Sequence, residues 1–228
     1  MSLLLHSFNP ASAVLSCCVE AAVLLTATPS GIAVFHPRDT NPAPLEWRSS
    51  APLLHAGVVA TEPLLILAVV AGPAGRHCTA LLLEAVGDVG PVRLVDKAPL
   101  VPETLPYISL LQPRFSNLQR LGSQTALCCA IAESCVHIVW VNRRPGHAPT
   151  LAVACTPLRQ LLAAGEGASV VVEAIALGPA SSHASPGGLL AGLVASTWPL
   201  GGGPAIRSAA CLALGSDEHL SMGPWFIR

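Results

Sequence analysis

Apolar residues are grouped along most of the chain into short runs, and the runs come in pairs separated by Gly, Pro, Asn, Asp or Ser. Short apolar runs bounded by turn residues are typical of strands that pair as antiparallel hairpins. The pattern predicts strands over residues 13–26, 32–36, 45–48, 53–60, 64–71, 78–86, 92–96, 125–132, 135–141, 151–155, 168–177, 189–197 and 206–214. We therefore expect a mainly β, antiparallel fold.

One short helix is expected over residues 157–164. Thr156 is a suitable N-cap, and Pro157 suits the first helical position because its missing N–H would be unpaired there anyway. Leu158 begins a stripe of leucines at i, i+3 and i+4, which is the spacing of an apolar helix face. Gly165 suits the left-handed residue that often follows a helix.

The most specific pattern lies in residues 134–151. Trp140 belongs to a run, 135–141, whose alternation predicts a half-buried strand. A polar, basic turn over 142–146 follows, and a second apolar run begins at Thr150. The segment therefore predicts two strands joined by a basic turn.

This segment resembles the third and fourth strands of a WD40-type β-propeller blade. It departs from the family pattern in two ways: Val141 stands where the signature has aspartate, and the Gly146–His147 pair lies in the turn instead of at the start of a blade. Strand pairs recur at roughly 45 residues, so the resemblance implies propeller-like repeats of about five blades. A ring this short is partial, and its exposed edges need a partner. A β-sandwich and an α+β fold are the alternative architectures.

We expect the chain to form one mainly-β domain over 1–228. Residues 99–123 predict a connector with a turn of helix, because a proline interrupts the helical spacing there. Two segments rich in Gly, Pro and Ser, 178–188 and 199–205, predict flexible links between strands.

The composition excludes several classes of protein. Hydrophobic residues make up 52% of the chain and charged residues 11%, so charge-driven disorder is excluded and a surface covered by a protein partner is expected. The net charge is −1 and the basic residues are not clustered, so no nucleic-acid binding is expected. The same composition can arise in a spurious reading frame, but the regular strand pattern argues against that origin.

No apolar run reaches the roughly 20 residues that a membrane-spanning helix needs. The N-terminal segment lacks the basic stretch of a secretory signal peptide. Most of the eight cysteines lie in apolar runs, as free buried thiols do. We therefore expect an intracellular protein, cytoplasmic or nuclear, without a signal peptide or a transmembrane helix.

The sequence contains no established catalytic or phosphate-binding motif. Its densest group of metal-ligand types is Cys128, Cys129, Cys135 and His137, but neighbouring residues on a strand point to opposite faces. No metal and no cofactor are therefore expected. Cys155 is the best single candidate for a reactive thiol, because it lies just before the predicted helix.

The candidate binding residues are Trp140, Arg143, Arg144, Trp198 and Trp225, since Trp and Arg are enriched at protein interfaces. We expect a non-catalytic scaffold or adaptor subunit of a multiprotein complex that acts through protein–protein contacts. The alternatives are a thiol-dependent enzyme with Cys155 as its nucleophile and a β domain that binds a small molecule or a peptide.

Overall fold

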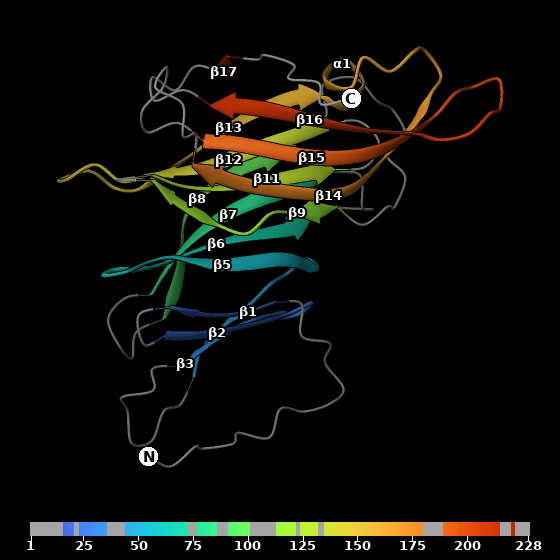
Figure 1. The fold of residues 1–228 in the computed structure, drawn as a ribbon. Coiled ribbons are helices and arrows are strands. Elements are labelled where there is room, and N and C mark those ends of the chain that lie inside the picture. The colour runs from blue at the N-terminus through green and yellow to red at the C-terminus, as the bar shows by residue number, and fades with distance from the viewer. Residues whose placement is uncertain are drawn as a thin grey trace, which may run out of the picture.

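The structure, a computed structural model, describes residues 16–20, 23–35, 44–72, 77–85, 91–100, 113–121, 124–131, 135–179, 189–214 and 220–221. These residues form four antiparallel β-sheets and one short helix (Figure 1). The expectation of a mainly β, antiparallel fold with one short helix is confirmed.

Each sheet takes its strands from one continuous part of the chain. The first sheet contains β1 (Ser16–Glu20), β2 (Val23–Thr28), β3 (Gly31–Phe35) and β4 (Leu45–Arg48). The second contains β5 (Leu53–Thr61), β6 (Leu64–Ala71), β7 (Cys78–Ala85) and β8 (Val92–Leu100). The third contains β9 (Arg114–Phe115), β10 (Gln119–Leu121), β11 (Gln124–Ile131), β12 (Cys135–Asn142) and β13 (Thr150–Pro157), which is followed by helix α1 (Leu158–Leu161). The fourth contains β14 (Ser169–Pro179), β15 (Leu189–Trp198), β16 (Ile206–Leu214) and β17 (Leu220–Ser221).

The sheets follow one another in chain order (Figure 1). Apolar side chains fill the space between neighbouring sheets. Leu25 and Ile66 belong to the cluster between the first and second sheets. Leu82 and Leu127 belong to the cluster between the second and third sheets. The cluster between the third and fourth sheets includes Leu158 of α1. The described residues show four such sheets, one fewer than the five blades that the repeat length implies.

The central strands of the second and third sheets are buried on both faces, since each of these sheets lies between two others. All residues of β6 except Ala71 are buried, and all residues of β12 except Asn142 are buried. The prediction of a half-buried strand over 135–141 was therefore wrong. The alternation of that strand separates two apolar interfaces, and it does not separate a core from solvent.

A carboxylate joins the edges of the second and third sheets. Asp96 on β8 accepts hydrogen bonds from the Leu151 N–H through Oδ2 and from the Lys97 N–H through Oδ1, each over 2.8 Å. An edge strand presents unpaired backbone groups, and a charged side chain is one way to cover them. Asp96 therefore fixes the position of β13 relative to β8.

Helix α1 differs from its prediction at both ends. It begins one residue later, at Leu158, and Pro157 occupies the N-cap position. It ends in a Schellman motif: Ala163 N–H donates to the Gln160 carbonyl over 3.4 Å, and Ala164 N–H donates to the Arg159 carbonyl over 3.0 Å. The left-handed residue of this motif is Ala163, with φ of 49°, and not Gly165.

The apolar stripe of the helix is confirmed, because the leucines at 158, 161 and 162 are all buried in the cluster between the third and fourth sheets. Burial of these three side chains holds the helix in place. A helix of four residues has little stability of its own.

Most predicted strands are present, with some different bounds. The run 13–26 is not one strand, because Glu20 on β1 pairs directly with Val23 on β2. The predicted connector 99–123 contains the last residues of β8 and the short strands β9 and β10, while 101–112 lie outside the described residues. Of the two predicted flexible segments, 178–188 begins with the last two residues of β14 and otherwise lies outside the described residues, and 199–205 form the exposed connection between β15 and β16.

Candidate functional site

The basic turn between β12 and β13 is a type II β-turn. His147 N–H donates to the carbonyl of Arg144 over 3.1 Å, and the two central residues are Pro145 and Gly146. Gly146 has φ of 78°, which a residue with a Cβ adopts only under strain. Proline and glycine therefore fix the turn, and the arginines stand at its start.

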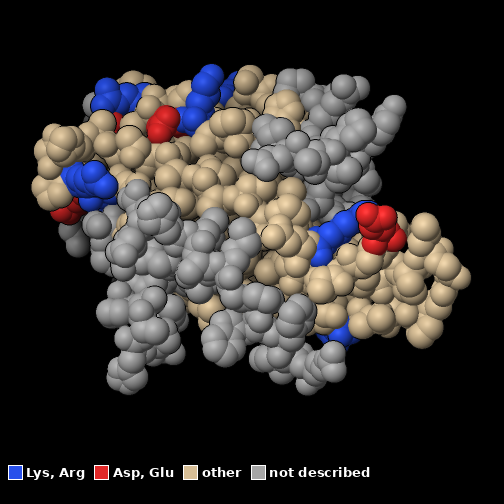
Figure 2. Space-filling view, turned by 90° about the horizontal axis from the view of Figure 1, so that it is seen from above, with Lys and Arg blue, Asp and Glu red and all other residues tan. Residues whose placement is uncertain are grey.

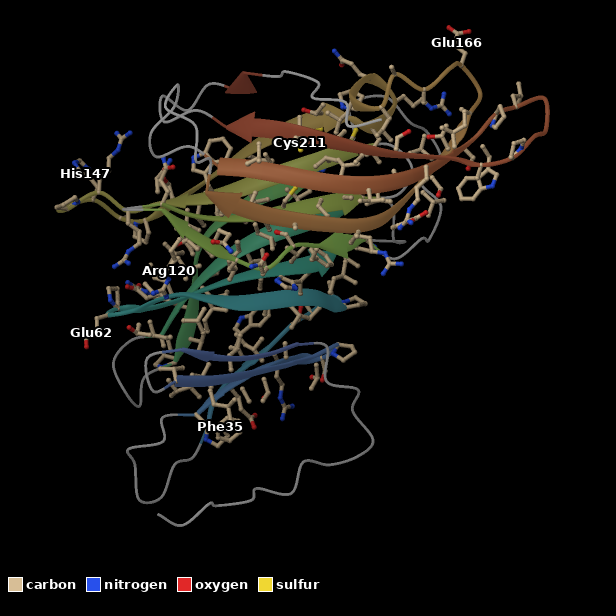
Figure 3. The ribbon with its side chains drawn as sticks, viewed as in Figure 1. Phe35, Glu62, Arg120, His147, Glu166 and Cys211 are labelled. Atoms are coloured by element: carbon tan, nitrogen blue, oxygen red, sulfur yellow. The ribbon has the colours of Figure 1, made fainter. Side chains whose placement is uncertain are left out.

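The arginines line a pocket of about 370 Å³ together with Pro63, Leu65, Pro145, His147 and Pro149. Arg143 is held in this pocket by a hydrogen bond from its Nη2 to the carbonyl of Glu62, over 3.2 Å. One wall thus comes from the turn between β5 and β6 and the other from the turn between β12 and β13. Figure 3 shows Glu62 and His147 at the same end of the molecule.

Trp140 lies away from this pocket, in the core. Its side chain is 5% exposed and packs in the cluster between the third and fourth sheets. Its indole N–H has no hydrogen-bond acceptor among the described residues. A ring at this depth contributes packing and offers no surface to a partner in this arrangement. Of the three neighbouring candidates, the structure brings only Arg143 and Arg144 together on the surface.

Trp198 lies on a second surface, the connection from β15 to β16. Trp198 is 41% exposed, Leu200 80% and Ile206 61%. We call these three residues the apolar tip. Leu200 and Ile206 also line a hollow of about 220 Å³ beside the loop that follows α1, where Figure 3 labels Glu166. Leu200 rests on Gly167, where an added Cβ would come within 2.8 Å of its Cδ2.

The apolar tip and the basic pocket lie at opposite ends of the strands (Figures 1 and 3). The sequence indicated Trp198 through its residue type, but not Leu200 or Ile206. Pro63 and Leu65 were also missed, since nothing in the local pattern shows that their turn meets the basic turn. Trp225 lies outside the described residues.

Charged side chains are sparse on the face drawn in Figure 2, where uncharged residues cover most of the described surface. Several of the charges are paired with each other. Arg93 contacts the Glu84 carboxylate at 2.6 Å, and Arg207 contacts the Glu173 carboxylate at 2.8 Å. Hydrogen bonding by Ser196, and then the charge of Arg207, hold the pKa of Glu173 below its usual value.

Cys155, the candidate reactive thiol, lies on β13 directly opposite His137 of β12. His137 is buried, and the helix begins three residues after Cys155 and has only four residues. Burial raises the pKa of Cys128 to about 12 and that of Cys78 to about 11. These two thiols are therefore protonated near neutral pH and are poor nucleophiles.

Within the described ranges, no group of three or more His, Cys, Asp or Glu side chains is arranged to hold a metal ion. No helix among the same residues is long and apolar enough to cross a membrane.

No family model matches the sequence, and no curated protein matches it. Among solved structures, the chain is similar to the N-terminal domain of Nup159, with 8% sequence identity and a TM-score of 0.26. That alignment covers 91% of this chain and 61% of the other, so the chain spans about three fifths of that domain.

Proposed function

We propose that this protein is a non-catalytic adaptor subunit that acts through protein–protein contacts. The observation that carries the proposal is the apolar tip. Three large apolar residues are exposed at the end of β15, in the connection and at the start of β16, with Leu200 80% exposed. Leu200 and Ile206 line one hollow, and exposed apolar surface of this kind is typical of a site that a partner covers. Tryptophan is also among the residues that most often dominate binding energy at interfaces.

The rest of the molecule fits this role. The buried thiols are chemically quiet, and sparse charge leaves the surface open to association. We further propose that the four sheets are blades of an open propeller, because each is an antiparallel sheet from one continuous part of the chain that packs on the next in chain order. We also propose that the partners are proteins of the cytoplasm or the nucleus.

The test is affinity purification of the tagged full chain from its native cell, with the bound proteins quantified by mass spectrometry. A variant carrying Trp198→Ser and Leu200→Ser should lose at least one partner that the unchanged chain retains. The matched control is Leu94→Ser, since Leu94 is 50% exposed on β8, in a different sheet. Identical partner sets for the tip variant and the unchanged chain would refute the role of the tip.

A purified enzyme activity would refute the non-catalytic part of the proposal. Cys155→Ser is the variant to compare in that case, because Cys155 is the thiol candidate that is only half-buried and lies opposite a histidine.

A further inference from the structure

We propose that the basic pocket binds an acidic peptide segment in which a carboxylate side chain stands next to an apolar one. The inference concerns the pocket between the turn that contains Pro63 and the turn that contains Arg143 and Arg144. It rests on the proposed role in protein–protein contacts and names the chemistry of one partner. The pocket is at the opposite end of the strands from the apolar tip, so the two sites can be tested separately.

The charge of the pocket suits an acidic ligand. Both charged side chains that line the pocket are arginines, and His147 lines it too, while no acidic side chain does. A guanidinium carries five N–H donors in a planar fork that matches a carboxylate. One hydrogen bond from Arg143 to the Glu62 carbonyl anchors that side chain. The guanidinium keeps further N–H donors for a ligand. In Figure 3 the carboxylate of Glu62 is directed away from the loop that carries His147.

The walls of the pocket suit an apolar side chain beside the acidic one. Three prolines and Leu65 form the rest of the lining, and a volume of about 370 Å³ is within the range of sites that hold small groups. Proline rings hold their conformation without an entropic cost on binding, so the site is largely formed in advance. An apolar side chain of the ligand would pack on these rings while its acidic neighbour reaches the arginines.

The turns that form the pocket are held in place before a ligand binds. The turn that positions Arg144 is a type II turn set by Pro145 and Gly146, and Arg143 is tied to the facing turn by its hydrogen bond. The backbone of Arg144 and the side chain of Arg143 are therefore positioned before a ligand arrives. Rigid sites lose less entropy on binding than flexible ones.

A peptide fits the pocket better than a nucleic acid does. Binding to a phosphate backbone requires many basic groups along the path of the nucleic acid. This pocket offers two arginines, and the whole chain has a net charge of −1. No Phe, Tyr or Trp side chain lines the pocket as a platform on which a base would stack.

The experiment measures binding of a fluorescein-labelled peptide of alternating Asp and Leu to the purified full chain by fluorescence anisotropy. The same peptide with Lys in place of Asp and an oligothymidylate serve as competitors. We expect saturable binding that weakens as salt is added, and a dissociation constant that rises roughly tenfold or more when Arg143→Gln and Arg144→Gln are combined.

The matched control combines Arg48→Gln and Arg159→Gln, which removes the same charge from exposed residues of β4 and α1. It should change the dissociation constant by less than about twofold. If the double pocket variant does not fold, as judged by circular dichroism, Arg144→Gln alone and the salt series of the unchanged chain decide the question.

The proposal is overturned by any of four results: no saturation up to about 1 mM peptide, equal weakening in the control, equal binding of the Lys peptide, or stronger competition by the oligothymidylate. A Trp198→Ser and Leu200→Ser chain should bind the peptide normally. Failure of this proposal would therefore leave the test of the apolar tip unaffected.

Discussion

Acid should weaken the contact between the second and third sheets through His55. The imidazole of His55 on β5 stacks on the ring of Phe115 on β9, with centroids 4.9 Å apart and planes 15° from parallel. Burial lowers the pKa of His55 to about 4, from 6.5. The folded chain therefore keeps this side chain neutral at a pH where the unfolded chain protonates it.

Proton linkage determines whether acid raises or lowers the free energy of unfolding. Between about pH 6.5 and about pH 4 the unfolded state binds one more proton than the folded state at this residue, so the free energy of unfolding falls as pH falls. Each pH unit in this window is worth up to about 1.4 kcal/mol. From about pH 7 to about pH 4.5 the loss from His55 is about 2 kcal/mol.

Urea unfolding followed by circular dichroism at both pH values measures this loss. His55→Phe is the matched variant, since it keeps an aromatic ring against Phe115 and removes the titrating group. The unchanged chain should lose about 2 kcal/mol more than the variant on acidification, because all other groups titrate in both. Equal losses in the two proteins would refute the reasoning.

Three further changes test other parts of the structure. Ala163→Gly should raise the free energy of unfolding by about 0.5–1 kcal/mol, because the backbone of Ala163 is in the left-handed region. The control Ala205→Gly, in an exposed connection, should lower it, and chemical denaturation measures both. Cys128 should resist iodoacetamide at neutral pH in the folded chain and react in urea, since burial raises its pKa to about 12. Mass spectrometry of the labelled peptides measures this, and fast labelling of the folded chain would contradict it. Leu127→Ala should cost about 2–5 kcal/mol of stability and leave the peptide affinity of the basic pocket unchanged if the chain stays folded.

The local parts of the fold were predictable from the sequence. Apolar runs bounded by turn residues predicted all strands except the short β9, β10 and β17, with β1 and β2 predicted as one run, because hairpin turns are set by nearby residues. The Schellman end of α1 was not predictable, since burial of three leucines places Ala163 at the left-handed position even though Gly165 lies two residues further on. Tertiary packing overrides local preference there.

The candidate site was predictable in its basic turn and not in its full form. Pro145 and Gly146 mark a turn, so the surface position of Arg144 follows from residues 142–147 alone. The opposite wall comes from a turn 81 residues earlier in the chain, as the hydrogen bond from Arg143 to the Glu62 carbonyl shows. No local pattern in the sequence predicts a contact between residues so far apart along the chain. Residue type alone also could not distinguish the core Trp140 from the exposed Trp198.

The use of one continuous stretch of chain for each sheet has a consequence for synthesis of the protein. A sheet made of consecutive strands needs no residue from later in the chain to complete its hydrogen-bond ladder. Each sheet can therefore form as it leaves the ribosome and present a finished apolar face to the next one. The strand pairings stay short in sequence separation, which favours fast assembly over the trapped, mispaired states that slow other β proteins. The growing chain lengthens the stack one sheet at a time, from its N-terminal end.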